Sequence, residues 1–459
     1  MAICKRVLIV SDNFVGGGLE NRILGQLDCY SSEKIKAYLA CGVFNNEFLS
    51  YFEKVLKCDS SGWYGAPIGR ILKQAQEIYD FCVENRIGRI ECHPWNLAFP
   101  AALAANRLRI PISLTLHGKT SVVKYDNFFL DTMQRHGFDE INIVGEHIRD
   151  EAEECFVNNT INVLPNSIKI ETHQVAARAR LGYWACISRL DKIKAGLIME
   201  ALKIMDAAGV ISVIEIFGGG DGEPWLLEEA KKLKKIKVLL RGWTSDAVET
   251  LKEGGYCCFL GMGLSAMEAA SLDIPVMILG YDGPYLEALS RESFEKIKNN
   301  NFTGFGLRPK KQVLRELKDL GDNKPNYKVG SLVKEKCSRE VVWGSYLSRI
   351  NSLEWKKKPA LDYLESFAKR AENKNCDIFD RGQQFAFCEG GSRGHYFDEG
   401  DLTFFIQSMS KWYRELYEEN TNKDRRIKKL ESDIANMHES TSWKITKPLR
   451  DIKLLIKKR

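Results

Sequence analysis

Two stretches decide the fold of this chain: residues 183–197 read YWACISRLDKIKAGL, and residues 256–283 read YCCFLGMGLSAMEAASLDIPVMILGYDG. Each stretch begins as a short apolar run, passes through a turn and continues with apolar residues at helical spacing. This order predicts a strand, a turn and a helix in both places. Arg189 and Lys194 fall in the first turn, and the glycines of residues 261–263 form the second.

Turns of this kind suit anions, because the first N–H groups of a helix point outward and glycine lets a phosphate approach the backbone. An arginine holds phosphate oxygens bidentately, and a lysine acts as a mobile point charge. Arg189 and Lys194 are therefore candidates for binding a diphosphate and neutralising the charge that develops as it leaves. Glu268 follows on the second helix, where a carboxylate can accept hydrogen bonds from ribose hydroxyls.

In these residues the chain resembles the retaining glycosyltransferases of GT-B fold, a family 4-like group of nucleotide-sugar enzymes that includes those of bacterial surface-polysaccharide assembly. The family carries R-L-x-x-x-K-G, then a strand ending in G-x-G, then E-G-x-G-x-x-x-x-E-A. Here the three segments read RLDKIKAG, VIEIFGGGDG and LGMGLSAMEA. The resemblance implies an α/β fold of two Rossmann-like doubly wound domains that face a central cleft. It also implies transfer of a sugar from a nucleotide diphosphate to a glycan or lipid-linked glycan acceptor.

The resemblance also assigns roles to residues. It places His117, Arg189 and Lys194 in the catalytic set, with His117 contacting the donor sugar. It places Glu20 and His93 with the acceptor or elsewhere in the site. The residues that it implies for donor binding are Gly17, Gly18, Gly219, Trp243, Gly263, Leu264 and Glu268.

The first half of the chain supports this assignment by its own pattern. His93 and His117 each end an expected strand, so both reach the rim where open α/β sheets bind ligands, although a lone histidine in a strand is more often structural. Glu20 follows a glycine turn, but it also suits the first turn of a helix. The expected strands are residues 7–11, 37–41, 90–93, 112–117, 141–144 and 161–164, then 185–187, 213–217, 236–240, 256–260 and 275–279.

Four features leave other interpretations open. Leu260 stands eight residues before Glu268, where the family has its first glutamate, so a catalytically silent homologue acting as a scaffold is one alternative. Ser265 and Glu268 have the spacing of a capping box, in which Glu268 only satisfies a helix terminus. Gly261-x-Gly263-x-x-Ala266 with Asp282 fits a dinucleotide fingerprint, so an NAD(P)-dependent oxidoreductase is a second alternative. The glycines of residues 218–222 can likewise form a tight turn without a ligand.

Composition gives an ordinary globular chain of 459 residues, 44% hydrophobic and 28% charged. We expect domains at residues 1–175 and 176–335, a crossover helix at 340–350 within residues 336–402, and a charged helix with a basic amphipathic tail at 403–459. The 13 cysteines show no metal-ligand spacing and are typical of a reducing cytoplasm. No D-x-D pair occurs, so neither a metal nor another cofactor is expected.

The net charge of +6 lies in the tail, because residues 441–459 hold seven basic residues and one acidic residue. A neutral body argues against nucleic acid as a partner. Apolar residues in this tail recur at three- and four-residue steps among the lysines, as in helices that lie in a membrane interface. We therefore expect a cytoplasmic enzyme that is peripheral on the inner face of the cell membrane. Its expected partners are a nucleotide sugar, a glycan or lipid-linked acceptor and an anionic membrane surface.

Overall fold

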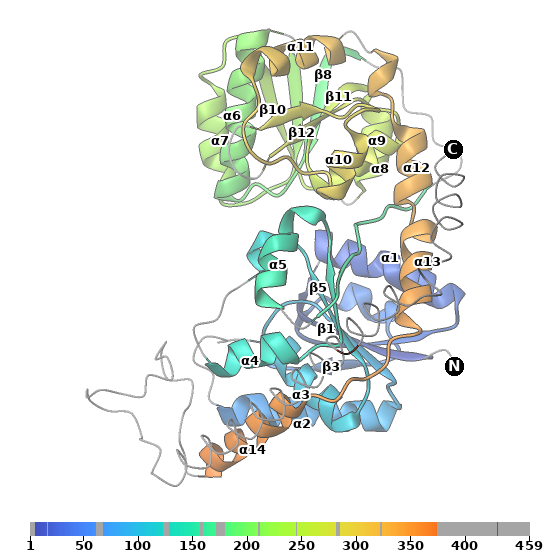
Figure 1. The fold of residues 1–459 in the computed structure, drawn as a ribbon. Helices are drawn as coiled ribbons and strands as arrows, with labels where there is room; N and C mark the ends of the chain where they lie inside the picture. The colour runs from blue at the N-terminus through green and yellow to red at the C-terminus, as the bar shows by residue number, and fades with distance from the viewer. Residues whose placement is uncertain are drawn as a thin grey trace, which may run out of the picture. The chain divides into compact units, whose positions relative to one another are not determined.

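The computed structural model describes residues 5–15, 17–60, 68–122, 128–156, 159–170, 180–209, 212–244, 246–280, 285–321, 324–373 and 429 (Figure 1). Residues through Lys358 belong to one compact unit, and helix α14 (Pro359–Asn373) belongs to a second. The expected charged helix, apart from Lys429, and the basic tail lie outside the described residues, as do residues 374–402 before them.

The first half is built on a sheet of seven parallel strands in the order β3-β2-β1-β4-β5-β6-β7. Most of its residues are buried, as expected for a parallel sheet that is covered on both faces. The strand order reverses between β1 and β4. The strands are β1 (Arg6–Phe14), β2 (Lys36–Phe44), β3 (Val55–Lys57), β4 (Arg89–Cys92), β5 (Ile112–Leu116), β6 (Glu140–Ile143) and β7 (Ile161–Val163).

Helices connect these strands. They are α1 (Gly18–Ser32), α2 (Ile68–Asn85), α3 (Ala98–Leu108), α4 (Phe128–His136) and α5 (Arg149–Cys155), with the 3₁₀ helices η1 (Asn46–Tyr51), η2 (Lys119–Ser121) and η3 (Glu146–Ile148).

The second half has a six-stranded sheet in the order β10-β9-β8-β11-β12-β13, in which only the pair β12–β13 is antiparallel. Its order reverses between β8 and β11. The strands are β8 (Arg180–Ile187), β9 (Val213–Phe217), β10 (Lys237–Gly242), β11 (Tyr256–Gly261), β12 (Val276–Leu279) and β13 (Leu286–Ala288). The helices are α6 (Lys192–Ala208), α7 (Glu223–Ala230), α8 (Ala247–Gly254), α9 (Gly263–Ser271), α10 (Phe294–Asn299) and α11 (Lys310–Gly321).

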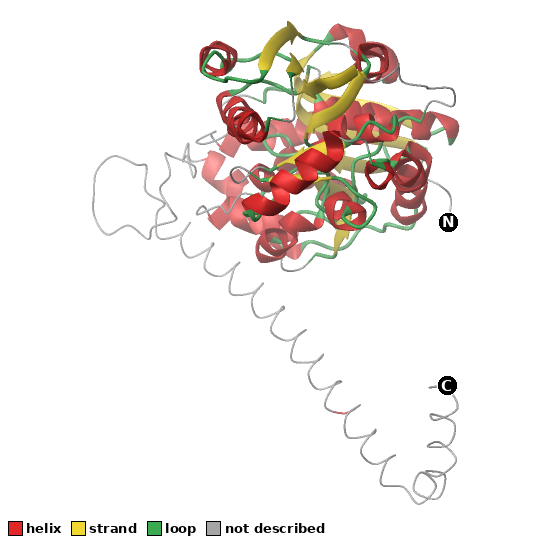
Figure 2. Cartoon of the chain, turned by 90° about the horizontal axis from the view of Figure 1, so that it is seen from above, coloured by secondary structure: helices red, strands yellow, loops and turns green. Residues whose placement is uncertain are grey.

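Side chains of β8 and β11 alternate between two hydrophobic cores, one on each face of this sheet. Trp184, Cys186 and Leu260 pack in the core that contains residues of α6 and α11. Ala185 and Phe259 pack in the other core, with α9 and α10. Figures 1 and 2 show this sheet lying between layers of helices. Because side chains along a strand alternate between its two faces, successive residues of β8 and β11 pack against opposite helix layers.

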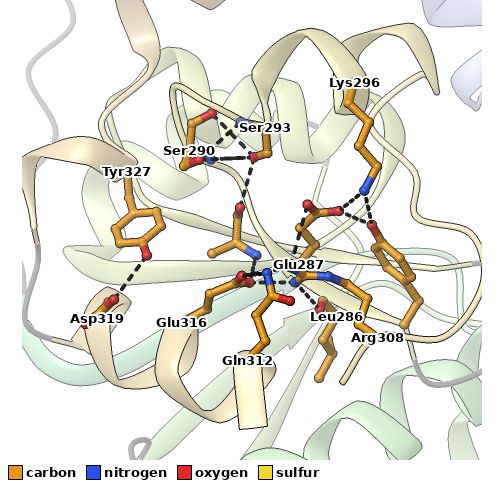
Figure 3. A network of polar contacts seen from close by, with 12 residues as sticks. Leu286, Glu287, Ser290, Ser293, Lys296, Arg308, Gln312, Glu316, Asp319 and Tyr327 are labelled. Atoms are coloured by element: carbon orange, nitrogen blue, oxygen red, sulfur yellow. Dashed lines mark hydrogen bonds and ion pairs between the residues drawn. The ribbon is translucent and has the colours of Figure 1, made fainter. Parts of the chain in front are cut away.

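The antiparallel edge strand β13 is held by a polar network rather than by apolar contacts alone (Figure 3). Arg308 donates to the carbonyl of Leu286 at 3.0 Å and pairs with Glu316 at 2.6 Å. Glu316 in turn accepts the N–H of Ala288 at 2.9 Å, and Glu287 lies 3.8 Å from the Arg308 guanidinium. Side chains from α11 and the segment before it thus fix the backbone of a strand only three residues long.

The chain then returns to the first half. After η4 (Pro325–Tyr327) and α12 (Gly330–Cys337), helix α13 (Arg339–Ile350) buries Trp343, Tyr346 and Leu347 in the core formed by β1, β2 and α1. Helix α13 covers the residues 340–350 at which a crossover helix was expected. The expected domain boundary near residue 175 falls among residues 171–179, which lie outside the described residues.

Every strand expected from the sequence is present, although β1, β2 and β8 extend further than predicted. Strands β3 and β13 were not predicted.

Candidate functional site

The turns that follow β8, β9, β10 and β11 are joined by hydrogen bonds at the carboxyl edge of the second sheet. Ser265 on α9 donates to the carbonyl of Ile187 at 3.0 Å, which links the β11 turn to the β8 turn. The N–H of Leu190 donates to the Gly219 carbonyl at 2.9 Å, and the N–H of Gly218 donates to the Gly242 carbonyl at 2.7 Å. Open α/β sheets bind ligands at this edge, beside the point where the strand order reverses.

Lys194 lines a small cavity at this edge. The cavity measures about 60 Å³, enough for a small polar group or a few waters. Burial, and then the nearby charge of Arg189, lower the pKa of Lys194. No carboxylate among the described residues forms an ion pair with Lys194. The residues around the cavity are Ile187, Ser188, Lys194, Ile198, Gly261, Met262, Ser265 and Leu279.

Arg189 is exposed in the adjoining turn, and no ion pair holds it within the described part of the chain. Its electrostatic effect on Lys194 places the two cations near each other. The helix that follows is less open than the sequence suggested, because the Asp191 carboxylate accepts the N–H of Lys194 at 2.9 Å and caps it. Asp191 therefore partly occupies the N-terminus of α6. An anion would be bound there mainly by the side chains of Arg189 and Lys194.

The N-terminus of α9 is open in comparison. Met262 occupies the N-cap and contributes no side-chain hydrogen bond. Gly263 adopts φ 64°, which favours glycine, and donates its N–H to the Phe302 carbonyl at 2.8 Å. The next N–H groups, of Leu264 and Ser265, have no acceptor within the helix and are directed outward. The side chain of Leu264 packs against the core, so only its backbone can serve a ligand.

The capping-box interpretation of Glu268 is wrong. Helix α9 begins at Gly263, so Ser265 lies inside the helix, and its hydroxyl bonds to the carbonyls of Ile187 and Met262. Burial, and then the negative charge of Asp246, raise the pKa of Glu268 to about 7. Among the described residues no hydrogen bond holds this carboxyl group, so capping does not account for its partial burial.

Leu260 is fully buried on the α6 side of β11, in the core with Trp184 and Cys186. The side chain at this position of the strand points into apolar packing. No polar contact with a ligand can be made from it.

Gly219 and Trp243 lie together. The Trp243 side chain is 70% exposed, and its indole nitrogen lies 2.9 Å from where a Gly219 Cβ would stand. Close packing explains why the two neighbouring positions are glycine. A Cβ on Gly218 would lie 1.8 Å from the Ser188 carbonyl oxygen, and a Cβ on Gly220 would lie 2.5 Å from the Leu190 carbonyl oxygen. The tight-turn interpretation therefore holds for Gly218 and Gly220, while Gly219 faces an exposed aromatic ring.

The first half brings the two predicted histidines into contact at its own carboxyl edge. His93 Nδ1 lies 2.8 Å from His117 Nε2. Burial, and then the charge of Arg22, lower the pKa of His93 to about 3. Burial, His93 and Arg22 hold the pKa of His117 well below its usual value. Both rings are therefore neutral near pH 7.

The glycine turn after β1 is partly occupied by the carboxylate of Glu20. Glu20 is buried, and its carboxylate accepts the N–H of Val15 at 3.2 Å. A Cβ on Gly17 would lie 3.1 Å from that carboxylate, whereas Gly18 has free space around it. The contacts of Glu20 favour the helix-turn interpretation over an acceptor contact.

Two residues that the sequence analysis missed organise this edge. Asp12, on β1, accepts the N–H groups of Trp95, Asn96 and Leu97 at 3.0 to 3.1 Å, which fixes the turn after His93. A carboxylate at the end of the first strand was the available signal.

The second residue that was not predicted is Arg22. It lies within helix α1, where no sequence motif marks it as a candidate. It is buried and donates to the carbonyls of Leu164 and Pro165, both at 2.9 Å, and to the Asn166 side chain at 2.8 Å. Burial lowers the pKa of Arg22 to about 10, so it keeps its charge at neutral pH.

Within the described residues, no group of three or more His, Cys, Asp or Glu is placed to hold a metal ion. No helix in the described ranges combines the length and apolar character that a membrane span requires.

Comparison with solved structures shows the fold. The chain is similar to the lipopolysaccharide outer core galactosyltransferase WaaB, with 15% identity over 76% of this chain and 99% of that one and a TM-score of 0.55. It is similar to HepE of Anabaena in complex with UDP-glucose, with 12% identity over 76% and 100% of the two chains and a TM-score of 0.56. It is also similar to sucrose-phosphate synthase of Thermosynechococcus elongatus, with 10% identity over 76% and 99% and a TM-score of 0.57.

The predicted fold class, a GT-B fold built from two Rossmann-like sheets, is confirmed. No protein-family model and no curated protein sequence matches the chain.

Proposed function

We propose that this chain is a glycosyltransferase that moves a sugar, with retention and without a metal, from a nucleotide diphosphate to a glycan or lipid-linked glycan. The observation that supports it best is the cavity at the edge of the second sheet. There Lys194, half-buried and without an ion-pair partner among the described residues, lies beside the exposed Arg189 and the start of α9, which has no side-chain cap. Three sources of positive charge converge on a space of phosphate size, which suits a departing diphosphate.

The remaining donor contacts follow from the surroundings of this cavity. Glu268 is one turn along α9 from Ser265, which lines the cavity, so its carboxylate would take the ribose hydroxyls. Trp243, exposed beside Gly219, offers an aromatic face for the base. One structural neighbour, HepE, was solved in complex with UDP-glucose, which supports a nucleotide sugar as the donor class. Retention is proposed from the sequence resemblance.

Metal independence is proposed from charge. Arg189 and Lys194 supply two cations where other enzymes use a bridging divalent ion, and the sequence has no D-x-D clamp. Transfer that survives a chelator would support this, and transfer that depends on an added divalent ion would contradict it.

A catalytically silent scaffold remains the second candidate, because Leu260 removes one carboxylate that the family carries. The oxidoreductase alternative has less support. Its glycine fingerprint normally occupies the first strand-to-helix turn of a dinucleotide-binding half, whereas here it follows β11, the fourth strand of its half.

A thermal-shift screen of nucleotide sugars followed by a transfer assay separates these candidates. A ligand present at about 100 times its Kd adds about 2.7 kcal/mol to the free energy of unfolding, enough to rank the donors. Stabilisation by one nucleotide sugar, with release of its nucleotide and a product of unchanged anomeric configuration, is the expected result. Stabilisation without turnover would indicate the scaffold, and stabilisation by NAD(P) alone would indicate the oxidoreductase.

We also propose that the protein works on the cytoplasmic face of a membrane, held there by its basic tail. The support is the charge and apolar spacing of residues 441–459.

A further inference from the structure

The two histidines of the first half contact each other through their ring nitrogens. His93 is 3% exposed, and its Nδ1 lies 2.8 Å from Nε2 of His117, with ring centroids 4.9 Å apart. The other ring nitrogen of His93, Nε2, is buried and has no hydrogen-bond partner. The other ring nitrogen of His117, Nδ1, has no partner among the described residues. The backbone of His117 is also fixed, because its N–H donates to the Ser121 hydroxyl at 3.2 Å.

Each neutral imidazole has one N–H and one lone pair. A nitrogen-to-nitrogen distance of 2.8 Å requires that one ring donates and the other accepts. If His117 donated, His93 would bear its proton on Nε2, which would be a buried N–H without an acceptor. If His93 donates from Nδ1, the unpaired Nε2 carries a lone pair instead.

The surroundings favour the second arrangement. Buried N–H groups without an acceptor are rarer in proteins than buried acceptor atoms without a donor. The unpaired Nε2 of His93 is therefore assigned a lone pair, which places the His93 proton on Nδ1, directed at His117. His117 Nε2 is then the acceptor, and its own proton must lie on Nδ1.

We propose that His93 is a positioning residue that fixes His117 in the Nδ1–H tautomer. His117 therefore presents a hydrogen-bond donor to a ligand oxygen and cannot serve as a general base in this state. The tautomer assignment stands on the geometry of the pair alone. That the ligand oxygen belongs to a hydroxyl of the donor sugar rests on the proposed function.

Solid-state ¹⁵N NMR of the full chain, labelled at histidine and without ligand, tests the assignment directly. The chain has seven histidines, and the spectrum of His117→Gln identifies the His117 signals by their loss. We expect a protonated Nδ1 and an unprotonated Nε2 on His117. A protonated His117 Nε2 in the unmodified protein would overturn the proposal. This result is independent of whether the protein transfers a sugar.

Two variants of His93 separate positioning from packing. In His93→Asn the side-chain amide can donate from a place close to that of Nδ1, so the His117 tautomer should be kept. In His93→Phe the ring is retained without a donor, so the protonated Nδ1 of His117 should no longer be the single form. An unchanged His117 spectrum in His93→Phe would show that His93 does not fix the tautomer.

With the donor identified, His93→Phe should lower kcat/KM roughly three- to tenfold, as expected for one lost hydrogen bond, and His93→Asn should restore most of it. Equal losses in both variants, with the tautomer kept in His93→Asn, would contradict the link between tautomer and ligand. If the unmodified protein and both variants transfer no sugar, the NMR result still decides the role of His93.

Discussion

Three cations stand at the junction of β8 and α6 in the second half, and their surroundings distinguish them. Lys192 is 80% exposed and only 4.0 Å from Asp221, whereas Lys194 lines the cavity and Arg189 adjoins it. We expect Arg189→Ala and Lys194→Ala to lower kcat roughly 100- to 1,000-fold, since each removes a donor aimed at developing charge. Lys192→Ala is the matched control and should keep its turnover. Melting temperatures should be alike in all three, and near-normal transfer by Arg189→Ala would exclude the assignment.

Glu268 should make donor binding depend on pH. With a pKa of about 7, Glu268 is largely protonated at pH 6 and largely ionised at pH 8. A carboxylate accepts stronger hydrogen bonds from ribose hydroxyls than a neutral carboxyl does, so donor affinity should rise roughly fivefold across this interval. The stability of the free protein should change in the opposite direction. The folded state holds this proton more tightly than the unfolded chain, so stability is lost as pH rises toward 7.

Titration of donor affinity in two variants checks the source of this dependence. Glu268→Gln should bind weakly at every pH, and at pH 6, where the carboxyl group of the unmodified protein is largely neutral, its melting temperature should be unchanged. Asp246→Asn keeps an N-cap for α8 but removes the charge that helps raise the pKa, so the midpoint should move to lower pH. A pH profile that is identical in Glu268→Gln and the unmodified protein would remove Glu268 from the donor site.

At the scale of elements, the packing of β11 leaves no room for a charged side chain at position 260. Leu260 alternates with Phe259 along the strand and is enclosed by the α6-side core. We expect Leu260→Glu to lower the free energy of unfolding by about 3 to 5 kcal/mol, because it buries a charge without a partner. Leu260→Met, the control of similar volume, should cost less than about 1.5 kcal/mol. Urea unfolding measures both, and a stable Leu260→Glu with higher transfer would contradict this packing.

Some elements of the fold could be predicted from the sequence and others could not. Long apolar runs such as β1 and β11 were predictable, because burial on both faces leaves a continuous hydrophobic signal. The three-residue strands β3 and β13 were not, since β13 depends on Arg308 and Glu316, whose partners are distant in sequence. The capping-box error has the same origin. Ser265 has the right spacing from Glu268, but its hydroxyl is taken by Ile187, which lies 78 residues away.

The site was predictable to the extent that it lies at strand ends. His93 and His117 could be placed at one rim because both follow parallel strands. Their direct contact, and the roles of Asp12 and Arg22, depend on how turns and helices pack above that rim. No spacing in the sequence encodes such contacts, which arise from tertiary structure alone.

For the whole molecule, positive charge occurs in two places that could attract an anionic membrane. One is the tail, residues 441–459. The other is a lysine groove of about 430 Å³ beside the edge strand β10, and the residues that line it include Lys231, Lys234, Lys235, Lys237, Leu227, Leu233 and Val238. Lysines beside an edge strand also discourage pairing with other chains, which explains the groove without a ligand. The tail combines charge with apolar residues at helical spacing, so we expect it to be the anchor.

Two variants of the protein decide between these surfaces. At roughly 1 kcal/mol for each basic residue near an anionic surface, the seven in the tail supply enough attraction for reversible binding. A chain ending at Glu439 should therefore lose sedimentation with anionic vesicles while it still glycosylates a soluble acceptor analogue. The full-length triple variant Lys234→Gln, Lys235→Gln, Lys237→Gln should sediment nearly as well as the unmodified protein. Binding of the full-length protein should weaken as salt is added, because the attraction between exposed charges is screened. Equal sedimentation of the truncated and full-length chains at low salt would show that the tail is not the anchor, and loss of binding in the triple variant would transfer that role to the groove.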